Sequence, residues 1–223
     1  MKNTFTIAVI LSFCFISSTF AQTIATYNKK GYKLTFISFD AKLDTILQRR
    51  MVYTFFTVYP ELAKAYNKKT LKEVMMVIDT AYKGVAETDN GKVTISSRWM
   101  HLHPEDIDVI THEVMHIVQD YGATETPGWL TEGIADYARY KFGVNNDAAN
   151  WKLPDYKPTQ SYTNAYRITA RFLLWIEEKV KPGIVKDLNN QLRKHTYTDG
   201  SWKDLTGKTV DELWKSYSET PTV

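Results

Sequence analysis

The amino-acid sequence predicts an α+β fold, in which a small mixed sheet precedes a mostly helical second half. The first hundred residues contain two strand-like runs, at 33–40 and 73–79. From Pro104 onwards, apolar residues recur at helical spacing instead. The composition, with 43% hydrophobic and 24% charged residues among 223, is typical of a globular chain. We expect one domain over residues 22–223, with a sheet-rich part (22–100) and a helical part (101–223).

The first 21 residues have the features of a secretory signal peptide. Lys2 precedes an apolar run over residues 7–16, and small and polar residues follow as far as Ala21. We expect cleavage near Ala21 and export, so that the mature chain is periplasmic or secreted. The alternative is lipidation at Cys14, the only cysteine, but the bulky Phe13 before it disfavours a lipoprotein signal. Without Cys14 the mature chain has no cysteine and no disulfide, so its hydrophobic core must stabilise the fold by itself.

The sheet-rich part contains strand, helix and hairpin patterns in that order. Residues 33–40 alternate between apolar and polar and predict a half-buried strand, while 43–59 have helical periodicity. Residues 73–79 are almost continuously apolar, which predicts an interior strand. The dipeptide Asn90-Gly91 is typical of a hairpin turn, here between strands at 84–88 and 92–97.

The second half contains five stretches with helical periodicity. Gly122 and Gly143 follow two of them, where helix ends are expected. The predicted helices are Glu105–Asp120, Trp129–Phe142, Asn164–Val180, Gly183–Lys194 and Val210–Ser218.

The first of these helices carries a His-Glu-x-x-His motif. His112 and His116 are four residues apart, so they project from the same helix face and can bind one zinc ion together. Glu113 lies beside them, where its carboxylate can act on water at the metal. Apolar residues on either side of the motif indicate that this helix is buried.

A catalytic zinc site needs a third protein ligand, and the next predicted helix offers two carboxylates. Glu132 and Asp136 are four residues apart and share a helix face. We interpret Glu132 as the third ligand of one zinc ion (Zn2+) per chain. We expect Asp136 to accept a hydrogen bond from a ligand histidine, His112, and to fix its tautomer. The reverse assignment, with Asp136 as the ligand, is the main alternative.

Several blocks around these residues resemble the basic secretory protein family of plants and bacteria. The blocks are THEVMHIVQDYG (111–122), PGWLTEGIADYARYKFG (127–143), AYRITARFLLWIEEK (165–179), LNNQLRK (188–194) and LTGKTVDELWKSY (205–217). GVAETDNGKVTISSRWM (84–100) resembles the strand before that family's active-site helix. The family is regarded as a group of secreted, zincin-like metallopeptidases. The resemblance therefore implies a zincin-like fold and peptide hydrolysis.

The resemblance also implies roles for further residues. Glu113 becomes the general base, and Tyr166, in a block that the family shares, is the first candidate for stabilising the oxyanion. Arg167 and Tyr137 are the alternatives to Tyr166. In zincin-like folds an edge strand before the active-site helix pairs with extended substrate, which implies peptide or protein substrates. We assign that strand to Lys92, Val93, Thr94, Ile95, Ser96 and Ser97.

Other classes of function have less support in the sequence. The net charge of +3 falls short of the basic stripe of a nucleic-acid binder. No segment after the N-terminal one is long and apolar enough to span a membrane, and we expect a monomer. Two alternatives to a peptidase stay open: an exported zincin-fold binding protein without turnover, and a metal-free domain whose histidines are only packed.

Overall fold

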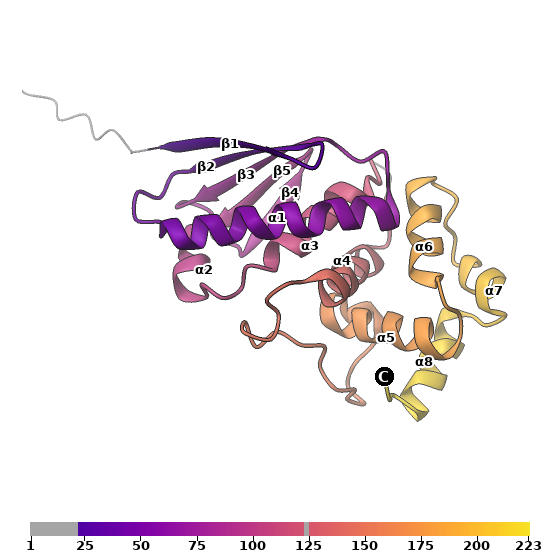
Figure 1. The fold of residues 1–223 in the computed structure, drawn as a ribbon. Helices are drawn as coiled ribbons and strands as arrows, with labels where there is room; N and C mark the ends of the chain where they lie inside the picture. Colours follow the sequence, from indigo (N-terminus) through magenta and orange to yellow (C-terminus); the bar gives the residue numbers. More distant parts are fainter. Residues whose placement is uncertain (1–21, 123–124) are drawn as a thin grey trace, which may run out of the picture.

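A five-stranded mixed sheet forms one layer of the protein in the computed structural model, which describes residues 22–122 and 125–223 (Figure 1). The predicted signal peptide and Cys14 lie outside the described residues. The strands are β1 (Thr23–Lys29), β2 (Tyr32–Ser38), β3 (Glu73–Asp79), β4 (Ala86–Asp89) and β5 (Lys92–Ser96), in the spatial order β1-β2-β3-β5-β4. β2, β3 and β5 are parallel, and β1 and β4 flank them as antiparallel edges.

Two tight hairpins attach the edge strands. Lys30 and Gly31 join β1 to β2, and Asn90 and Gly91 join β4 to β5, all with φ between 45° and 78°. Positive φ at both central residues gives a turn whose twist matches that of the paired strands. The Asn90-Gly91 hairpin was predicted from the sequence, and so were β2 and β3. β1 was not predicted.

Helix α1 (Thr45–Tyr66) connects β2 to the parallel strand β3 and packs against the sheet. Asp44 caps it by accepting hydrogen bonds from two backbone N–H groups of the first turn. The helical pattern predicted an end at Tyr59, but the helix continues through Pro60. Proline removes one backbone donor. The next turn buries Leu62 and Ala63, and this packing keeps the chain helical.

Three helices then follow β5: α2 (Ser97–Leu102), α3 (Val109–Gln119) and α4 (Gly128–Phe142). α3 packs between α1 and α4 and is buried along almost its whole length. The predicted start of α3 at Glu105 is wrong by four residues. The segment before Val109 is irregular, and at its end the Asp108 carboxylate accepts hydrogen bonds from the backbone N–H groups of Val144 and Asn145, beyond α4.

The C-terminal part covers the side of α4 that faces away from the sheet (Figure 1). α5 (Tyr166–Lys179) packs along α4, and α6 (Ile184–Arg193), α7 (Ser201–Thr206) and α8 (Val210–Glu219) complete this part. Phe172, Trp202, Trp214 and Tyr217 form a cluster of aromatic rings between these helices. The α+β prediction is confirmed.

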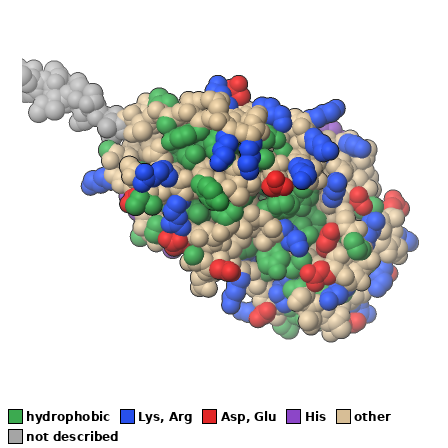
Figure 2. Space-filling model, in the orientation of Figure 1, with side chains coloured by type: hydrophobic (Ala, Val, Ile, Leu, Met, Phe, Trp, Pro, Cys, Tyr) green, Lys and Arg blue, Asp and Glu red, His purple; other side chains and the backbone are tan. Residues whose placement is uncertain are grey.

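The surface carries charges of both signs. On the face shown in Figure 2, Lys and Arg side chains lie singly or in small groups among acidic and apolar ones. Among the helices of the described ranges, we find none with the length and apolar character that a membrane span requires.

Candidate metal centre

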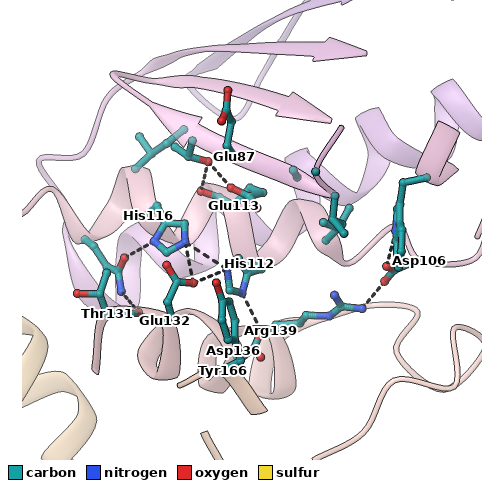
Figure 3. A pocket seen from close by; sticks show the side chains of 18 of the residues that line it. Glu87, Asp106, His112, Glu113, His116, Thr131, Glu132, Asp136, Arg139 and Tyr166 are labelled. Atoms are coloured by element: carbon teal, nitrogen blue, oxygen red, sulfur yellow. Dashed lines mark hydrogen bonds and ion pairs between the residues drawn. The ribbon is translucent and has the colours of Figure 1, made fainter. Parts of the chain in front are cut away.

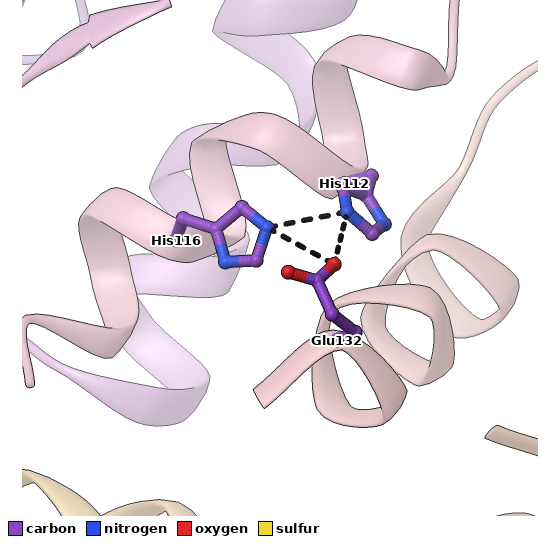
Figure 4. Close-up of side chains that lie close together, drawn as sticks. All are labelled: His112, His116 and Glu132. Atoms are coloured by element: carbon purple, nitrogen blue, oxygen red, sulfur yellow. Dashed lines mark hydrogen bonds and ion pairs between the residues drawn. The ribbon is translucent and has the colours of Figure 1, made fainter. Parts of the chain in front are cut away.

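Helices α3 and α4 bring three potential metal ligands to one point (Figure 4). His112 and His116 come from successive turns of α3, and Glu132 comes from the facing side of α4. The Nε2 atoms of the two histidines are 3.2 Å apart. Oε2 of Glu132 lies 3.1 Å from Nε2 of His112 and 3.6 Å from Nε2 of His116.

The far nitrogen of each histidine ring is held by a hydrogen bond. Nδ1 of His112 donates to Oδ1 of Asp136 at 2.7 Å, and Nδ1 of His116 donates to Oε1 of Gln119 at 2.7 Å. The orientation of the Gln119 amide is itself set, because its Nε2 donates to the carbonyl of Thr131 at 2.8 Å. With both Nδ1 atoms acting as donors, the two Nε2 lone pairs point to the same place.

The site attracts positive charge. Burial lowers the pKa of His112, but hydrogen bonds with Asp136 and Glu132 outweigh it and raise the pKa to about 10. Burial raises the pKa of Glu132, while the hydrogen bonds with His112 and His116 bring it down to about 2. The carboxylates thus stabilise a positive charge between the rings, and a metal cation would compete with the proton for the same nitrogens.

The donor set fits zinc. Two imidazole nitrogens and one carboxylate form the set of a catalytic site that keeps one position open. For bonds of 2.0–2.2 Å, the ligand atoms of a tetrahedral site are about 3.3–3.6 Å apart. The observed separations of 3.1, 3.2 and 3.6 Å are close to these values. His112, His116 and Glu132 could therefore hold this metal without large rearrangement.

Glu113 lies next to this cluster, between α3 and the sheet (Figure 3). Its side chain is buried, and its Oε2 accepts a hydrogen bond of 2.7 Å from the hydroxyl of Thr88 on β4. The same hydroxyl is 3.0 Å from the Glu113 carbonyl oxygen, so Thr88 fixes both the side chain and its helix against the strand. Glu113 and the three candidate ligands line one cleft of about 1750 Å³.

Tyr166 lies across the cleft from Glu113, at the start of α5 (Figure 3). Its ring is nearly parallel to that of His112, with centroids 6.1 Å apart, and 54% of the residue is exposed. The negative charge of Glu132, and then burial, raise the pKa of the phenol, so it remains a donor at neutral pH. Ala165 and Tyr166 have φ of 62° and 49°, an unfavourable backbone that turns this residue into the cleft.

The two alternatives to Tyr166 lie in different places. Arg167 also lines the cleft, and its guanidinium reaches the carbonyl of Lys152 at 3.5 Å. Tyr137 is buried within α4 and belongs to the hydrophobic core instead.

The predicted substrate strand must be corrected. Lys92–Ser96 form β5, which pairs with β3 on one side and β4 on the other, and Ser97 begins α2. The backbone of β5 is therefore already engaged in the sheet and cannot pair with a peptide. β4 is the edge strand, and Ala86–Asp89 border the cleft beside Glu113.

Two nearby histidines take no part in the cluster. His103 ends α2, and its ring packs on Trp99, with centroids 4.0 Å apart. Nε2 of His101 is 2.6 Å from Oδ2 of Asp40, which also accepts a hydrogen bond from Ser97. Burial raises the pKa of Asp40, but the hydrogen bonds, from Ser97 above all, more than offset this and lower the pKa below its usual value.

Two residues of the site, Gln119 and Thr88, were not predicted. Gln119 follows His116 by three residues, and helical spacing alone places it on the same face. Thr88 lies in a predicted strand, but which side chains of that strand face α3 depends on register, which the sequence did not fix.

Comparisons with known proteins agree with this geometry. Residues 21–217 match the model of a family described as peptidases of plants and bacteria (BSP). A search of curated proteins finds no match to the chain.

Three of the solved structures that match illustrate the shared fold. Aminopeptidase A of Legionella pneumophila, in complex with aspartic acid, is 13% identical over 87% of this chain and 27% of that one, with a TM-score of 0.62. A mutant M1 zinc metallopeptidase of Deinococcus radiodurans, bound to Tyr-Ser-Ala, is 17% identical over 91% of this chain and 52% of that one, with a TM-score of 0.56. An aminopeptidase N family protein of Idiomarina loihiensis is 10% identical over 87% of this chain and 46% of that one, with a TM-score of 0.55. This chain spans about a quarter to a half of their lengths, and the likeness shows a zincin-like fold.

Proposed function

The chain belongs to the peptidase family of plants and bacteria, and from this membership we propose that it is a zinc-dependent metallopeptidase that hydrolyses peptide bonds. The observation that carries the proposal is the convergence of two histidine nitrogens and one carboxylate oxygen beside Glu113, in a single cleft. A peptidase of this kind needs the metal, held by its ligands, and the general base to act at the same substrate carbonyl.

His112, His116 and Glu132 would hold one zinc ion per chain. Asp136 is the less suitable third ligand, because its carboxylate already binds Nδ1 of His112, on the far side of the ring. Its role is to fix the tautomer of His112 and to raise the basicity of Nε2. When bound, zinc supplies Lewis acidity, which lowers the pKa of water towards ~7 and polarises a substrate carbonyl.

Glu113 acts as the general base in this proposal. Thr88 binds one oxygen of its carboxylate, Oε2, and keeps the side chain in one orientation. The carboxylate accepts a proton from the attacking water and later donates it to the departing amine. Burial of Glu113 removes competing solvent, so the proton stays between the carboxylate and the reacting groups.

Tyr166 is proposed to donate a hydrogen bond to the oxyanion. Its raised pKa keeps the hydroxyl protonated, and its ring lies beside His112 on the open side of the cleft. Arg167, on the next position of α5, is the competing donor. A Tyr166→Phe variant separates them, because it removes only the hydroxyl and should lower kcat much more than it raises KM.

β4 is proposed to bind the backbone of an extended peptide. Within the described sheet it has a neighbour on one side only, and it runs along the cleft next to Glu113. Main-chain pairing with such an edge does not depend on side-chain identity, which suits peptide or protein substrates.

The wider setting of the enzyme is also proposed. We infer that residues 22–223 act as one domain and as a monomer, and that the chain is exported after cleavage near Ala21. The inference of export rests on the signal-peptide pattern of the sequence.

The competing function is an exported binding protein with the same cleft and no turnover. Cleavage of unstructured protein or a peptide library by the wild type and by Glu113→Gln distinguishes the two. We expect loss of about 10²-fold or more in the variant, with zinc still bound, because the general base is lost and the ligands stay. Equal cleavage by both proteins would refute the mechanism, and no cleavage by zinc-loaded wild type would favour the binding protein.

A further inference from the structure

The cleft has two unlike halves, one on either side of the candidate metal ligands. Beyond His116, towards the end of α3, its lining is mostly polar and includes Gln119, Asp120, Thr126 and Thr131, beside Ile117 and Tyr121. Before His112, towards the start of α3, its lining is largely apolar and includes Trp99, Leu102, Val109 and Trp151. A cleft with this asymmetry discriminates between side chains on the two sides of a bound peptide.

A hydrogen-bond network builds the apolar half. Asp106 accepts a hydrogen bond from Nε1 of Trp99 at 2.8 Å and forms an ion pair with Arg139 of α4 (Figure 3). Arg139 also donates to Asn146 at 3.1 Å, and its guanidinium carbon lies 4.3 Å from the ring centroid of Trp151. Arg139 thus holds two aromatic walls that come from separate segments of the chain.

The charge at this pocket is balanced. The Arg139 side chain is only 6% exposed, and the paired Asp106 carboxylate is 13% exposed. A buried, paired guanidinium attracts a substrate carboxylate much less than a free one does. Glu105 also lines this half, and its carboxylate is paired with Arg50. The exposed apolar surface is that of the half-buried rings of Trp99 and Trp151 and of Leu102, which is 63% exposed. Such a pocket favours a large apolar side chain over a charged one.

The direction of β4 indicates which side of the scissile bond faces this pocket. Ala86 pairs with Ile95, near the end of β5 that leads into α2 and Trp99, whereas Asp89 pairs with Lys92 at the opposite end. Antiparallel pairing is the slightly more stable arrangement. A peptide antiparallel to β4 enters at Asp89 and leaves at Ala86. Its C-terminal portion therefore lies in the apolar half.

We propose that Trp99, Val109 and Trp151 form a specificity pocket for a large apolar side chain on the residue that follows the scissile bond. Arg139 and Asp106 are positioning residues, since they hold the two tryptophans in place. This inference rests on the proposed peptidase function and names the substrate class of the same site.

Quenched fluorescent peptides that vary only in the residue after the scissile bond test the proposal. With Phe or Leu at that position we expect kcat/KM at least about tenfold higher than with Ala, mainly through KM, and no gain with Asp or Lys. Trp151→Ala should reduce the Phe-to-Ala ratio about tenfold. Tyr53→Ala, which removes an exposed aromatic ring on α1 outside the cleft, should not. If Trp151→Ala fails to fold, Leu102→Ala on the exposed rim should reduce the ratio in the same direction.

A second variant tests whether Asp106 neutralises the charge of Arg139. Asp106→Asn leaves the Arg139 guanidinium without its counter-ion, so peptides with Asp or Glu after the scissile bond should gain relative to Phe. A purely structural role for Asp106 would change all peptides equally and would overturn this part of the proposal. Binding of the same peptides to Glu113→Gln, followed by tryptophan fluorescence, gives a readout that does not need turnover.

The outcomes separate the two proposals. Cleavage by the wild type with no preference for bulky apolar residues, or with a preference for acidic ones, overturns the pocket and leaves the peptidase intact. No cleavage of any peptide, with tighter binding of the Phe peptide to Glu113→Gln, supports the pocket and contradicts the peptidase function. Equal binding of the Phe and Ala peptides contradicts the pocket in either case.

Discussion

Replacing Gln119 by alanine tests the link that orients one of the candidate ligands. Gln119 is 1% exposed and holds Nδ1 of His116 at 2.7 Å. Without it, the ring of His116 loses the acceptor that fixes its tautomer and rotation. Loss of such a partner costs 10–100-fold in metal affinity, or about 1.4–2.8 kcal/mol. We therefore expect Gln119→Ala to weaken zinc binding by this factor.

Competition between the protein and a chromogenic chelator measures the affinity. Gln119→Glu is the matched control, because it keeps an acceptor for His116 and removes the donor to Thr131. We expect Gln119→Glu to bind zinc close to the wild-type affinity but to unfold at a lower temperature. Wild-type affinity in Gln119→Ala, with the chain folded, would refute the orienting role of this residue.

Three further predictions concern stability. Gly133→Ala should destabilise the protein by about 1–3 kcal/mol in denaturant titrations, because a Cβ there would clash with Cγ2 of Thr169 on α5. Gly128→Ala is the control, because a Cβ there meets nothing within 4 Å, and it should have little effect on stability. Equal losses of stability in the two variants would contradict the close contact of α4 and α5. Chelation should lower the thermal unfolding temperature reversibly, since zinc at 100 times its Kd contributes about 2.7 kcal/mol; an unchanged temperature would argue against a bound metal. Asp40→Asn should lose stability at neutral pH and approach the wild type in acid. The folded-state pKa of Asp40 lies below its usual 3.8, so its contribution is complete above that value and lost as the pH falls through the lowered pKa. A difference that is independent of pH would contradict this.

Helical periodicity explains why much of the candidate site could be predicted. Residues four apart on a helix share a face whatever the surroundings, so His112 and His116 were placed together from spacing alone, and so were Glu132 and Asp136. That the two pairs face each other follows from the short connection between α3 and α4. The division of roles between the two carboxylates needed the structure, which sets Glu132 against Nε2 and Asp136 against Nδ1 of His112.

Sheet topology was harder to predict, because neighbours along the chain need not lie in spatial order. The sequence identified the hairpin around Asn90, but not which of its two strands would form the edge of the sheet. The second strand, β5, lies between β3 and β4, so the first strand became the edge. The backbone conformation of Tyr166 was equally hard to predict. Its positive φ has no signal in the sequence, because tyrosine rarely adopts this conformation.

The metal content of the purified mature protein tests the central claim most directly. Elemental mass spectrometry of the wild type, with His112→Ala and Glu132→Ala alongside, should find about one zinc per chain in the wild type and little in either variant. No tightly held metal in the wild type after zinc is offered, or equal zinc in the variants, would contradict the account. The histidines of α3 would then be packing residues, and the cleft would need another chemistry.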